Sequence, residues 1–317
     1  MRAELRHQVS LAYLLFRIAD TIEDSTWPDL QQQKNAFQQF LGFISEPATA
    51  EQIKNYTQLF PTTVPDEEKI LLNDLTILLQ DLHDLPVEAL VPLRQSLTDM
   101  IKGMQHFATP DNARVKTMAE LNQYCFFVAG LVGELLTELA LKRRLSLPND
   151  EAVLLNSHHF GLFLQKINIL KDQSKDENEG RHFVPDRQLI WESLKENSDH
   201  GFSYISQLPS TLRDYKLFCA YSFFLGLFSL SYIENSWLSK MATRIPRAIV
   251  TAFLAQVENK IDDNTALEEI YLKYKNKLAS PTLFVDLKTI QLEPLQWFKQ
   301  SYSRTLPMMH LKSLGII

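Results

Sequence analysis

Glycine and strand-like patterns are both scarce in this sequence. Nine glycines occur among 317 residues, about 3% against the usual ~7%, and no stretch shows the alternation of apolar and polar residues that marks a half-buried strand. Segments rich in Leu, Gln, Glu, Lys and Ala recur instead, and prolines divide them into about ten helical pieces. The sequence therefore predicts an all-α protein. Because no repeat, linker or low-complexity segment interrupts it, we expect a single domain over residues 1–317.

Basic clusters are absent. The net charge is −6 and the longest basic run is Lys142-Arg-Arg144, so the sequence lacks the electrostatic footprint of a nucleic-acid-binding protein. Cysteine is nearly absent as well: Cys125 and Cys219 each lie in an apolar run, without CxxC spacing or a disulfide framework. We expect both to be buried thiols of a protein in a reducing compartment, which favours the cytoplasm.

Two common cofactor motifs are missing. No HExxH or HxxxH spacing occurs among the eight histidines, so a zinc site is not indicated. We expect these histidines, including the adjacent His158 and His159, at the surface or at helix ends. No GxGxxG occurs either, so a nicotinamide cofactor would have to bind without a Rossmann unit. Gly130 and Gly133 fall within a helical segment, where glycine permits close contact between helices.

Long hydrophobic runs are few. The first, at residues 11–16, is short and ends at Arg17, so no signal peptide is indicated. The longest uncharged stretch, 217–233, has 17 residues, the lower edge of membrane-spanning length. Its Ser and Tyr content favours a central helix of a soluble bundle. We expect it to line the centre of the fold with the other dense apolar segments, 117–141 and 152–171.

Two short acidic motifs stand out against this apolar background. Asp20 and Asp24 close one apolar, helix-patterned run, and Asp172 and Asp176 close another. Residues four apart project from one face of a helix, so each pair of carboxylates repels unless a positive charge lies between them. Carboxylate oxygens suit Mg²⁺, which is usually shared between one or two carboxylates and the phosphates of a substrate. The two pairs therefore predict a cavity that binds a diphosphate through Mg²⁺.

Neighbouring polar residues extend each motif along its helix. Helical spacing aligns Tyr13 and Arg17 with the first pair of acids, and Gln165 and Asn168 with the second. The other positions of both helices are mostly Leu, Phe, Ile and Ala, which need burial themselves. A polar stripe on so apolar a helix favours a functional cavity over bulk water.

Five ordered segments resemble the squalene/phytoene synthase family, and their residues are most similar to those of squalene synthases. The resemblance covers about residues 5–260 and rests on the segments 13–17, 20–24, 122–133, 161–172 and 176–185. It implies an all-α class I isoprenoid synthase fold, a helical bundle with a central cavity flanked by the two acidic motifs. It also implies a prenyltransferase that joins two farnesyl diphosphates head to head, through presqualene diphosphate, to squalene or dehydrosqualene.

The resemblance assigns roles to individual residues. Tyr124 matches the catalytic tyrosine of the family and Tyr13 a second cavity tyrosine. The implied Mg²⁺ ligands are Asp20, Asp24, Asp172 and Asp176, with Glu23 as the middle acid of the first motif. The implied diphosphate-binding residues are Arg17, Arg181, Lys171, Gln165 and Asn168. Phe126, Phe127, Phe163 and Phe183 can supply polarisable aromatic faces to an allylic cation, although each alone is more typical of core packing.

Three departures from the family pattern leave alternatives open. Lys175 occupies a usually acidic position and Lys171 a usual arginine, and family members carry a further amino-terminal segment with a Ser-Arg-Ser-Phe motif that contacts diphosphate. The alternatives are a phytoene synthase that uses geranylgeranyl diphosphate and a catalytically silent family member that acts as a binding or assembly partner. For a reduced nicotinamide (NADPH), the basic segment 240–247 offers Arg244 and Arg247. Peripheral membrane contact, expected of an enzyme with a lipid product, and the oligomeric state are left open.

Overall fold

The computed structural model describes residues 1–109, 114–146, 149–178, 180–239, 245–276 and 296–317. These residues form fifteen α-helices, and the only strand-like pairing among them is an isolated bridge between Arg114 and His182. The all-α prediction is confirmed. In chain order the helices are α1 (Ala3–Asp24), α2 (Leu30–Ser45), α3 (Ala50–Thr57), α4 (Asp66–Asn73), α5 (Leu75–His83), α6 (Val87–Phe107), α7 (Met118–Cys125), α8 (Leu131–Leu141), α9 (Glu151–Asn178), α10 (Arg187–Gln207), α11 (Arg213–Ser239), α12 (Arg247–Glu258), α13 (Asn264–Lys275), α14 (Gln296–Ser301) and α15 (Met308–Ser313).

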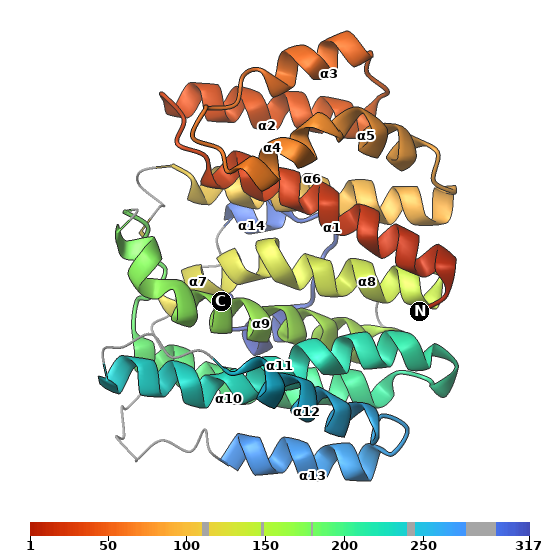
Figure 1. Ribbon diagram of the computed structural model, residues 1–317, viewed down its shortest axis with the longest axis vertical. Helices are drawn as coiled ribbons and strands as arrows, with labels where there is room; N and C mark the ends of the chain where they lie inside the picture. Colours follow the sequence, from red (N-terminus) through yellow and green to blue (C-terminus); the bar gives the residue numbers. More distant parts are fainter. Residues whose placement is uncertain (110–113, 147–148, 179, 240–244, 277–295) are drawn as a thin grey trace.

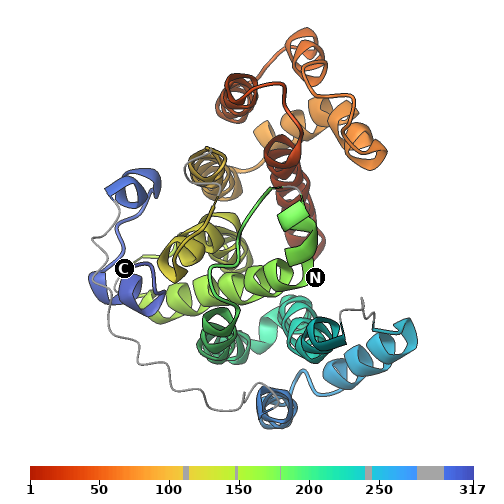
Figure 2. The same cartoon turned by 90° about the vertical axis from the view of Figure 1, so that its left-hand side faces the viewer.

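The helices lie in successive tiers across the molecule (Figure 1). Helices α1 to α5 form one end, α6 to α9 the middle, and α10 to α13 the other end. Helix α9 is central, because it packs against α8, α10 and α11. The chain returns to the middle at its end: α14 and α15 lie beside α7 and α9 (Figure 2). The three dense apolar segments of the sequence correspond to α7–α8, α9 and α11. Most large side chains of α7–α8 and α9 are buried as expected, whereas α11 buries one face and leaves Phe218 40% exposed.

A capping box starts the helix that carries Tyr124. The Thr117 side chain accepts from the Glu120 backbone N–H at 3.2 Å, and the Glu120 carboxylate accepts from the Thr117 N–H at 3.1 Å. Such reciprocal bonds satisfy amide groups that the first turn leaves unpaired. Helix α7 then runs without a break into a π-helical turn, Phe126–Gly130, and on into α8. π-helical turns are frequent at functional sites.

Close contact between α8 and α9 depends on glycine. A Cβ atom at Gly133 would lie 2.2 Å from the Ser157 carbonyl oxygen, and one at Gly161 would lie 2.3 Å from the Ala129 carbonyl oxygen. Both distances are far below van der Waals contact, so any larger residue would push the two helices apart. The expectation that glycine in 130–133 serves helix packing is confirmed. This contact fixes the register of the Tyr124 segment against the helix that carries the second acidic motif.

Two helical stretches are long and apolar enough to cross a membrane by length and composition alone: Met118–Leu141, with 67% of its most apolar window buried, and Ser210–Ser236, with 39%. Core helices of soluble proteins meet the same criterion, so this evidence is weak. Within the second stretch, Phe223, Phe224, Leu227 and Leu230 are buried in the core, as expected of a central helix.

The expectation of surface histidines was wrong for the central helix. His158 and His159 on α9 are buried, and so is His310 on α15. The expectation for the cysteines is confirmed: Cys125 and Cys219 are buried free thiols. The His158 Nε2 atom lies 2.9 Å from the Glu134 carboxylate, and the His159 Nδ1 atom accepts from the Asn197 amide at 2.8 Å. These partners, which lie 24 and 38 residues away along the chain, make burial of the imidazoles tolerable. Local sequence spacing does not reveal such partners.

Acid should destabilise the protein through His159. Burial lowers the pKa of His159 from 6.5 to about 2, with nearby His200 and Lys166 adding to the effect. Below about pH 6.5 the unfolded chain therefore binds a proton at this position that the folded chain does not, so the contribution of His159 to stability is lost as the pH falls. We expect His159→Gln to abolish this loss, worth about 1.4 kcal/mol per pH unit.

Urea unfolding of the parent and of His159→Gln at about pH 6 and about pH 5, with about pH 8 as the reference, measures the effect. The two pH profiles must be subtracted, because folding raises the pKa of Asp20 to about 7 and of Glu23 to about 8. These carboxyls bind protons more tightly in the folded state and oppose the His159 slope. Parallel profiles for the parent and the variant would show that His159 does not titrate differently on folding.

Candidate functional site

The ends of α1 and α9 place the two acidic motifs at one cavity. The cavity has a volume of about 400 Å³. Asp20 and Asp24 enter it from the last turns of α1, Asp172 and Asp176 from the last turns of α9. Its complete lining is Arg17, Asp20, Glu23, Asp24, Tyr124, Val128, Gln165, Asn168, Ile169, Lys171, Asp172, Lys175, Asp176, Arg181 and Phe183. Every residue proposed from the sequence for metal or diphosphate lines this cavity.

Arg181 connects the two acidic motifs. Its guanidinium forms an ion pair with Asp24 on α1, and a second with Asp176 on α9 at 3.3 Å. Gly180, just before it, has a φ of +79°, a left-handed conformation that glycine adopts without a steric penalty. The Arg181 N–H then donates to the Asp176 carbonyl oxygen at 2.9 Å. The end of α9 thus folds back so that Arg181 faces both pairs of carboxylates.

Arg17 has a partner that the sequence reasoning missed. It forms an ion pair with Glu68 on α4 and approaches Asp20, one turn further along α1, at 3.7 Å. The Glu68 side chain is only 14% exposed. In the sequence, Glu68 follows Asp66 and Glu67 at the start of a helix, where acidic residues are common for local reasons. Only the packing of α4 against α1 reveals its relation to the cavity.

Negative charge is crowded in the cavity. Five acidic and four basic side chains line it. Burial raises the pKa of Asp20 to about 7; Asp24 and Glu68 add to the shift and Arg17 opposes it. Burial also raises the pKa of Glu23 to about 8, with Asp24 and Asp20 adding to it and Arg181 opposing it. Burial is the largest cause of both shifts, and a bound cation would stabilise these carboxylates in their charged form.

Tyr124 forms part of the cavity wall. Its ring is buried and stacks on Phe183 with centroids 4.5 Å apart and planes at 17°. Burial, with Glu23 and Asp24 nearby, raises the pKa of the Tyr124 phenol well above its usual value. Phe183 is the one residue of the four proposed aromatic faces that lines this cavity. Phe126, Phe127 and Phe163 are fully buried instead, which agrees with the core packing that the sequence favoured for each of them alone.

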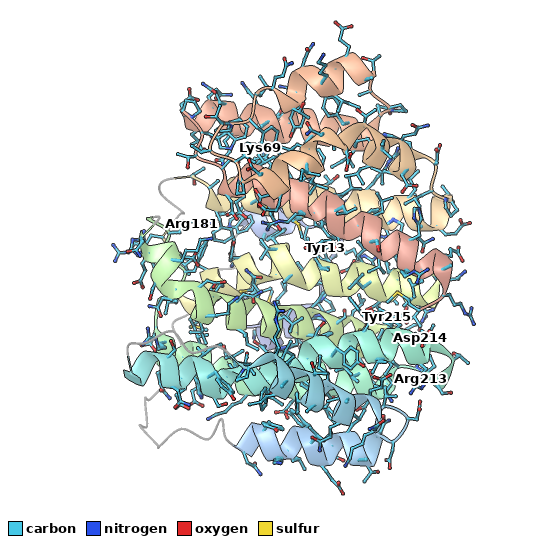
Figure 3. All side chains as sticks on the ribbon, in the orientation of Figure 1. Tyr13, Lys69, Arg181, Arg213, Asp214 and Tyr215 are labelled. Carbon is cyan, nitrogen blue, oxygen red and sulfur yellow. The ribbon has the colours of Figure 1, made fainter. Side chains whose placement is uncertain are left out.

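A second, larger cavity adjoins the acidic one. It has a volume of about 940 Å³ and shares Arg17, Glu23, Asp24, Lys175 and Arg181 with it. Tyr13 and Arg181, both labelled in Figure 3, line this second cavity. Tyr13 is 65% exposed and is not among the residues that line the acidic cavity. Tyr13 therefore shares a cavity with Glu23 and Asp24 of the first motif, but not with Asp172 and Asp176 of the second.

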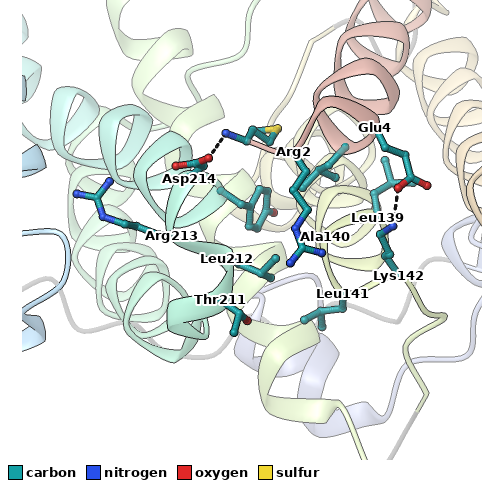
Figure 4. A pocket seen from close by; sticks show the side chains of 13 residues that line it. Arg2, Glu4, Leu139, Ala140, Leu141, Lys142, Thr211, Leu212, Arg213 and Asp214 are labelled. Carbon is teal, nitrogen blue, oxygen red and sulfur yellow. Dashed lines mark hydrogen bonds and ion pairs between the residues drawn. The ribbon is translucent and has the colours of Figure 1, made fainter.

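Another hollow, about 340 Å³, lies between the start of α1, the end of α8 and the start of α11 (Figure 4). Its charged residues form ion pairs across it: Lys142 pairs with Glu4, and Asp214 with the terminal amine. No pair of acids at helical spacing lines it. The chemistry predicted from the sequence is concentrated at the other end of α1.

The acidic cavity fits Mg²⁺ by its donor chemistry. Among the described residues, no three histidine, cysteine or carboxylate side chains are gathered closely enough to hold a metal ion alone. Mg²⁺ does not require such a set, because it usually takes one or two protein carboxylates and completes its shell with water and phosphate oxygens. The two carboxylate pairs and the raised pKa of Asp20 match that requirement.

The proposed nicotinamide contacts are not built into this site. Arg247 is exposed at the first turn of α12 and lines neither of the two adjoining cavities. Arg244 lies outside the described residues. A nicotinamide contact at this segment therefore stays a prediction, because only residues 245–247 of it are described.

Known proteins share the family match and the fold. The squalene/phytoene synthase family model matches residues 1–200. The squalene synthase of Mycosarcoma maydis is 30% identical over 194 residues, which cover 60% of this chain and 32% of that protein. The squalene synthase of Schizosaccharomyces pombe is 28% identical over 220 residues, 65% of this chain and 45% of that protein. The chain thus matches less than half the length of these relatives.

A solved structure described as TcSQS in complex with the ligand BPH1237 has the same fold. Its TM-score is 0.71 at 21% sequence identity, and the match covers 99% of this chain and 92% of that one. The protein is thus an all-α isoprenoid-synthase-type bundle with paired acidic motifs at one cavity. The chain belongs to the squalene/phytoene synthase family.

Proposed function

We propose that this protein catalyses the Mg²⁺-dependent head-to-head condensation of two farnesyl diphosphates, through presqualene diphosphate, to squalene or dehydrosqualene. One observation carries the proposal: acidic motifs from α1 and α9 line a single cavity together with four basic side chains. Such a cavity can bind a diphosphate and stabilise the charge that develops as it leaves. The squalene synthases among the similar proteins support the same substrate class.

In this proposal the basic residues bind the diphosphate directly. Arg17 and Arg181 each present a planar fork of donors that suits phosphate oxygens, and Lys171 adds a point charge 3.4 Å from Asp172. Gln165 and Asn168 offer amide donors on the same wall. Asp20, Asp24, Asp172 and Asp176, with Glu23, would hold Mg²⁺. When bound, Mg²⁺ supplies positive charge to the departing diphosphate oxygens.

Tyr124 and Phe183 would act on the allylic carbocation. Because its pKa lies well above the usual value, the Tyr124 phenol keeps its proton at neutral pH and can donate to a diphosphate oxygen in the cavity. The Phe183 ring stacked on it excludes water and presents a polarisable surface to the cation. The adjoining cavity, lined by Tyr13 and Leu14 as well as the shared charged residues, offers room for the second prenyl chain.

Product analysis tests the proposal. The protein is incubated with farnesyl or geranylgeranyl diphosphate, with Mg²⁺ or a chelator, and with or without reduced nicotinamide; extracted lipids are analysed by mass spectrometry. We expect metal-dependent products from farnesyl diphosphate: squalene with the nicotinamide, and presqualene diphosphate or dehydrosqualene without it. Turnover of geranylgeranyl diphosphate alone would identify a phytoene synthase. No turnover of either substrate would indicate a silent family member. Identical unreduced products in both conditions would refute reduction but not condensation.

A further inference from the structure

The last described segment of the chain holds the turn that carries Tyr124. Residues 297–317, here called the C-terminal segment, lie beside α7 and α9 (Figure 2). Asn122 and Gln123, the two residues before Tyr124, are buried amides. The Asn122 side chain donates to the Gly315 carbonyl oxygen at 2.9 Å, and the Gln123 side chain donates to the Ile316 carbonyl oxygen at 3.1 Å.

The direction of these two bonds is fixed by chemistry. A backbone carbonyl oxygen can only accept, so each amide must turn its nitrogen towards the C-terminal segment. The Asn122 Oδ1 and Gln123 Oε1 atoms are buried without a hydrogen-bond partner, which is the cost of this orientation. Both side chains therefore leave an oxygen unpaired in order to donate to the C-terminal segment. The two adjacent bonds indicate that this contact determines the orientation of both amides.

Glycine allows the segment to approach so closely. Gly315 ends α15 with a φ of +63°, and its N–H donates to the Lys312 carbonyl oxygen at 2.9 Å. The carbonyl groups of Gly315 and Ile316 lie beyond the helix and can accept from side chains. A Cβ atom at Gly315 would lie 2.6 Å from the Asn122 side-chain nitrogen. The close approach therefore requires glycine for both its conformation and its size.

Aromatic contacts make a second, independent connection. Trp297 stacks on Phe127, with centroids 5.2 Å apart, and meets the edge of Phe107 at 5.7 Å. Phe107 in turn meets Tyr124 at 5.3 Å, on a ring that also stacks on Phe183. The Tyr124 ring thus lies between Phe183 of the cavity wall and a ring that the C-terminal segment supports.

Polar anchors away from Tyr124 hold the segment itself. Tyr302 donates to Glu134, the Arg304 Nε atom lies 2.8 Å from the same carboxylate, and the Ser303 N–H donates to Asp99 at 2.9 Å. The two acidic partners, Glu134 and Asp99, are buried, and the Arg304 side chain is only 16% exposed. These anchors fix the segment to α6 and α8, so it can serve as a rigid support.

We propose that the C-terminal segment positions Tyr124 for the reaction, with Asn122 and Gln123 as positioning residues. The proposal rests on the proposed function, because it takes Tyr124 as the group that meets the substrate. Loss of the two amide bonds should allow the end of α7 to shift relative to Phe183. A small displacement of a reacting group lowers turnover while the metal and diphosphate contacts on α1, on α9 and at Arg181 just beyond α9 remain intact.

The test compares the parent with the double variant Asn122→Leu/Gln123→Met, which keeps side-chain size and removes both donors. The matched control is Leu79→Ala, a buried position on α5 that lowers stability without touching the cavity. We expect the double variant to lower kcat about tenfold with KM within about twofold. We expect the control to lower the melting temperature with kcat unchanged.

A second readout does not depend on activity. In protein labelled with 3-fluorotyrosine, the ¹⁹F resonance of Tyr124, assigned by its loss in Tyr124→Phe, reports the ring current of Phe183. We expect this resonance to move in the double variant and to stay in place in Leu79→Ala. An unmoved resonance, or a loss of kcat no larger than that of Leu79→Ala, overturns the positioning role. If the parent itself shows no turnover, the proposed function fails, and the ¹⁹F shift alone decides whether the segment positions Tyr124.

Discussion

Asp172→Asn and Asp20→Asn are each expected to lower turnover of farnesyl diphosphate at least ~100-fold, because stabilisation of charge on a leaving group is typically worth that much. Asparagine keeps the shape of the side chain and removes its charge, so the bundle should remain folded. The two positions belong to different helices but line one cavity. A comparable loss of turnover from each substitution would therefore indicate that both motifs contribute to one site.

The control for this pair is Asp262→Asn. Asp262 also pairs with an arginine, Arg213, at 2.9 Å, but it is 67% exposed and far from the acidic motifs in sequence. We expect it to leave steady-state turnover unchanged. Helical content by circular dichroism should be the same in all three variants. Near-normal turnover in either Asp172→Asn or Asp20→Asn would refute the model in which both motifs bind the metal and diphosphate.

The fold class and the acidic cavity could be predicted because their signals are local. An apolar run that ends in acids four apart specifies a helix, its buried faces and a charged end, and α1 and α9 have that form. Gly133 and Gly161 meet the facing backbone, which follows from scarce glycine in an apolar helical segment. The family resemblance predicted Tyr124 as a cavity residue, and helical spacing predicted Gln165 and Asn168. All three line the same cavity.

What the sequence did not reveal depends on partners far along the chain. Glu68 resembles any acid at a helix start until α4 packs on α1 and places it against Arg17. His158 resembles a polar surface residue until Glu134 and His310 enclose it. Burial of an ionisable group is a statement about its surroundings, and those surroundings are assembled from helices that have no common pattern in the sequence.

The same limit explains the aromatic residues. Phe126 and Phe183 both lie within the motif segments of the sequence, yet Phe126 is fully buried in the core and Phe183 lines the cavity. The difference arises because residues 126–130 form a π-helical turn inside a continuous helix, whereas Phe183 follows the reversal of the chain at Gly180. Helical periodicity carries no information about either feature.

Arg181→Met is expected to lower turnover about 100-fold, the second large effect. The side chain pairs with an acid of each motif, Asp24 and Asp176. Removing it takes a fixed positive charge away from the diphosphate and leaves two carboxylates without that partner. Because both carboxylates remain partly exposed, the accompanying loss of stability should be small.

Arg181→Lys distinguishes charge from geometry. Lysine restores the charge as a single point, whereas arginine can contact two carboxylates or two phosphate oxygens at once. We therefore expect Arg181→Lys to recover only part of the turnover lost in Arg181→Met, with a raised KM for farnesyl diphosphate. Arg213→Met, which removes an arginine paired with an exposed acid on another part of the molecule, is the matched control and should behave as the parent. Full recovery by lysine would show that charge alone matters at this position, and unchanged turnover in Arg181→Met would remove Arg181 from the diphosphate site altogether.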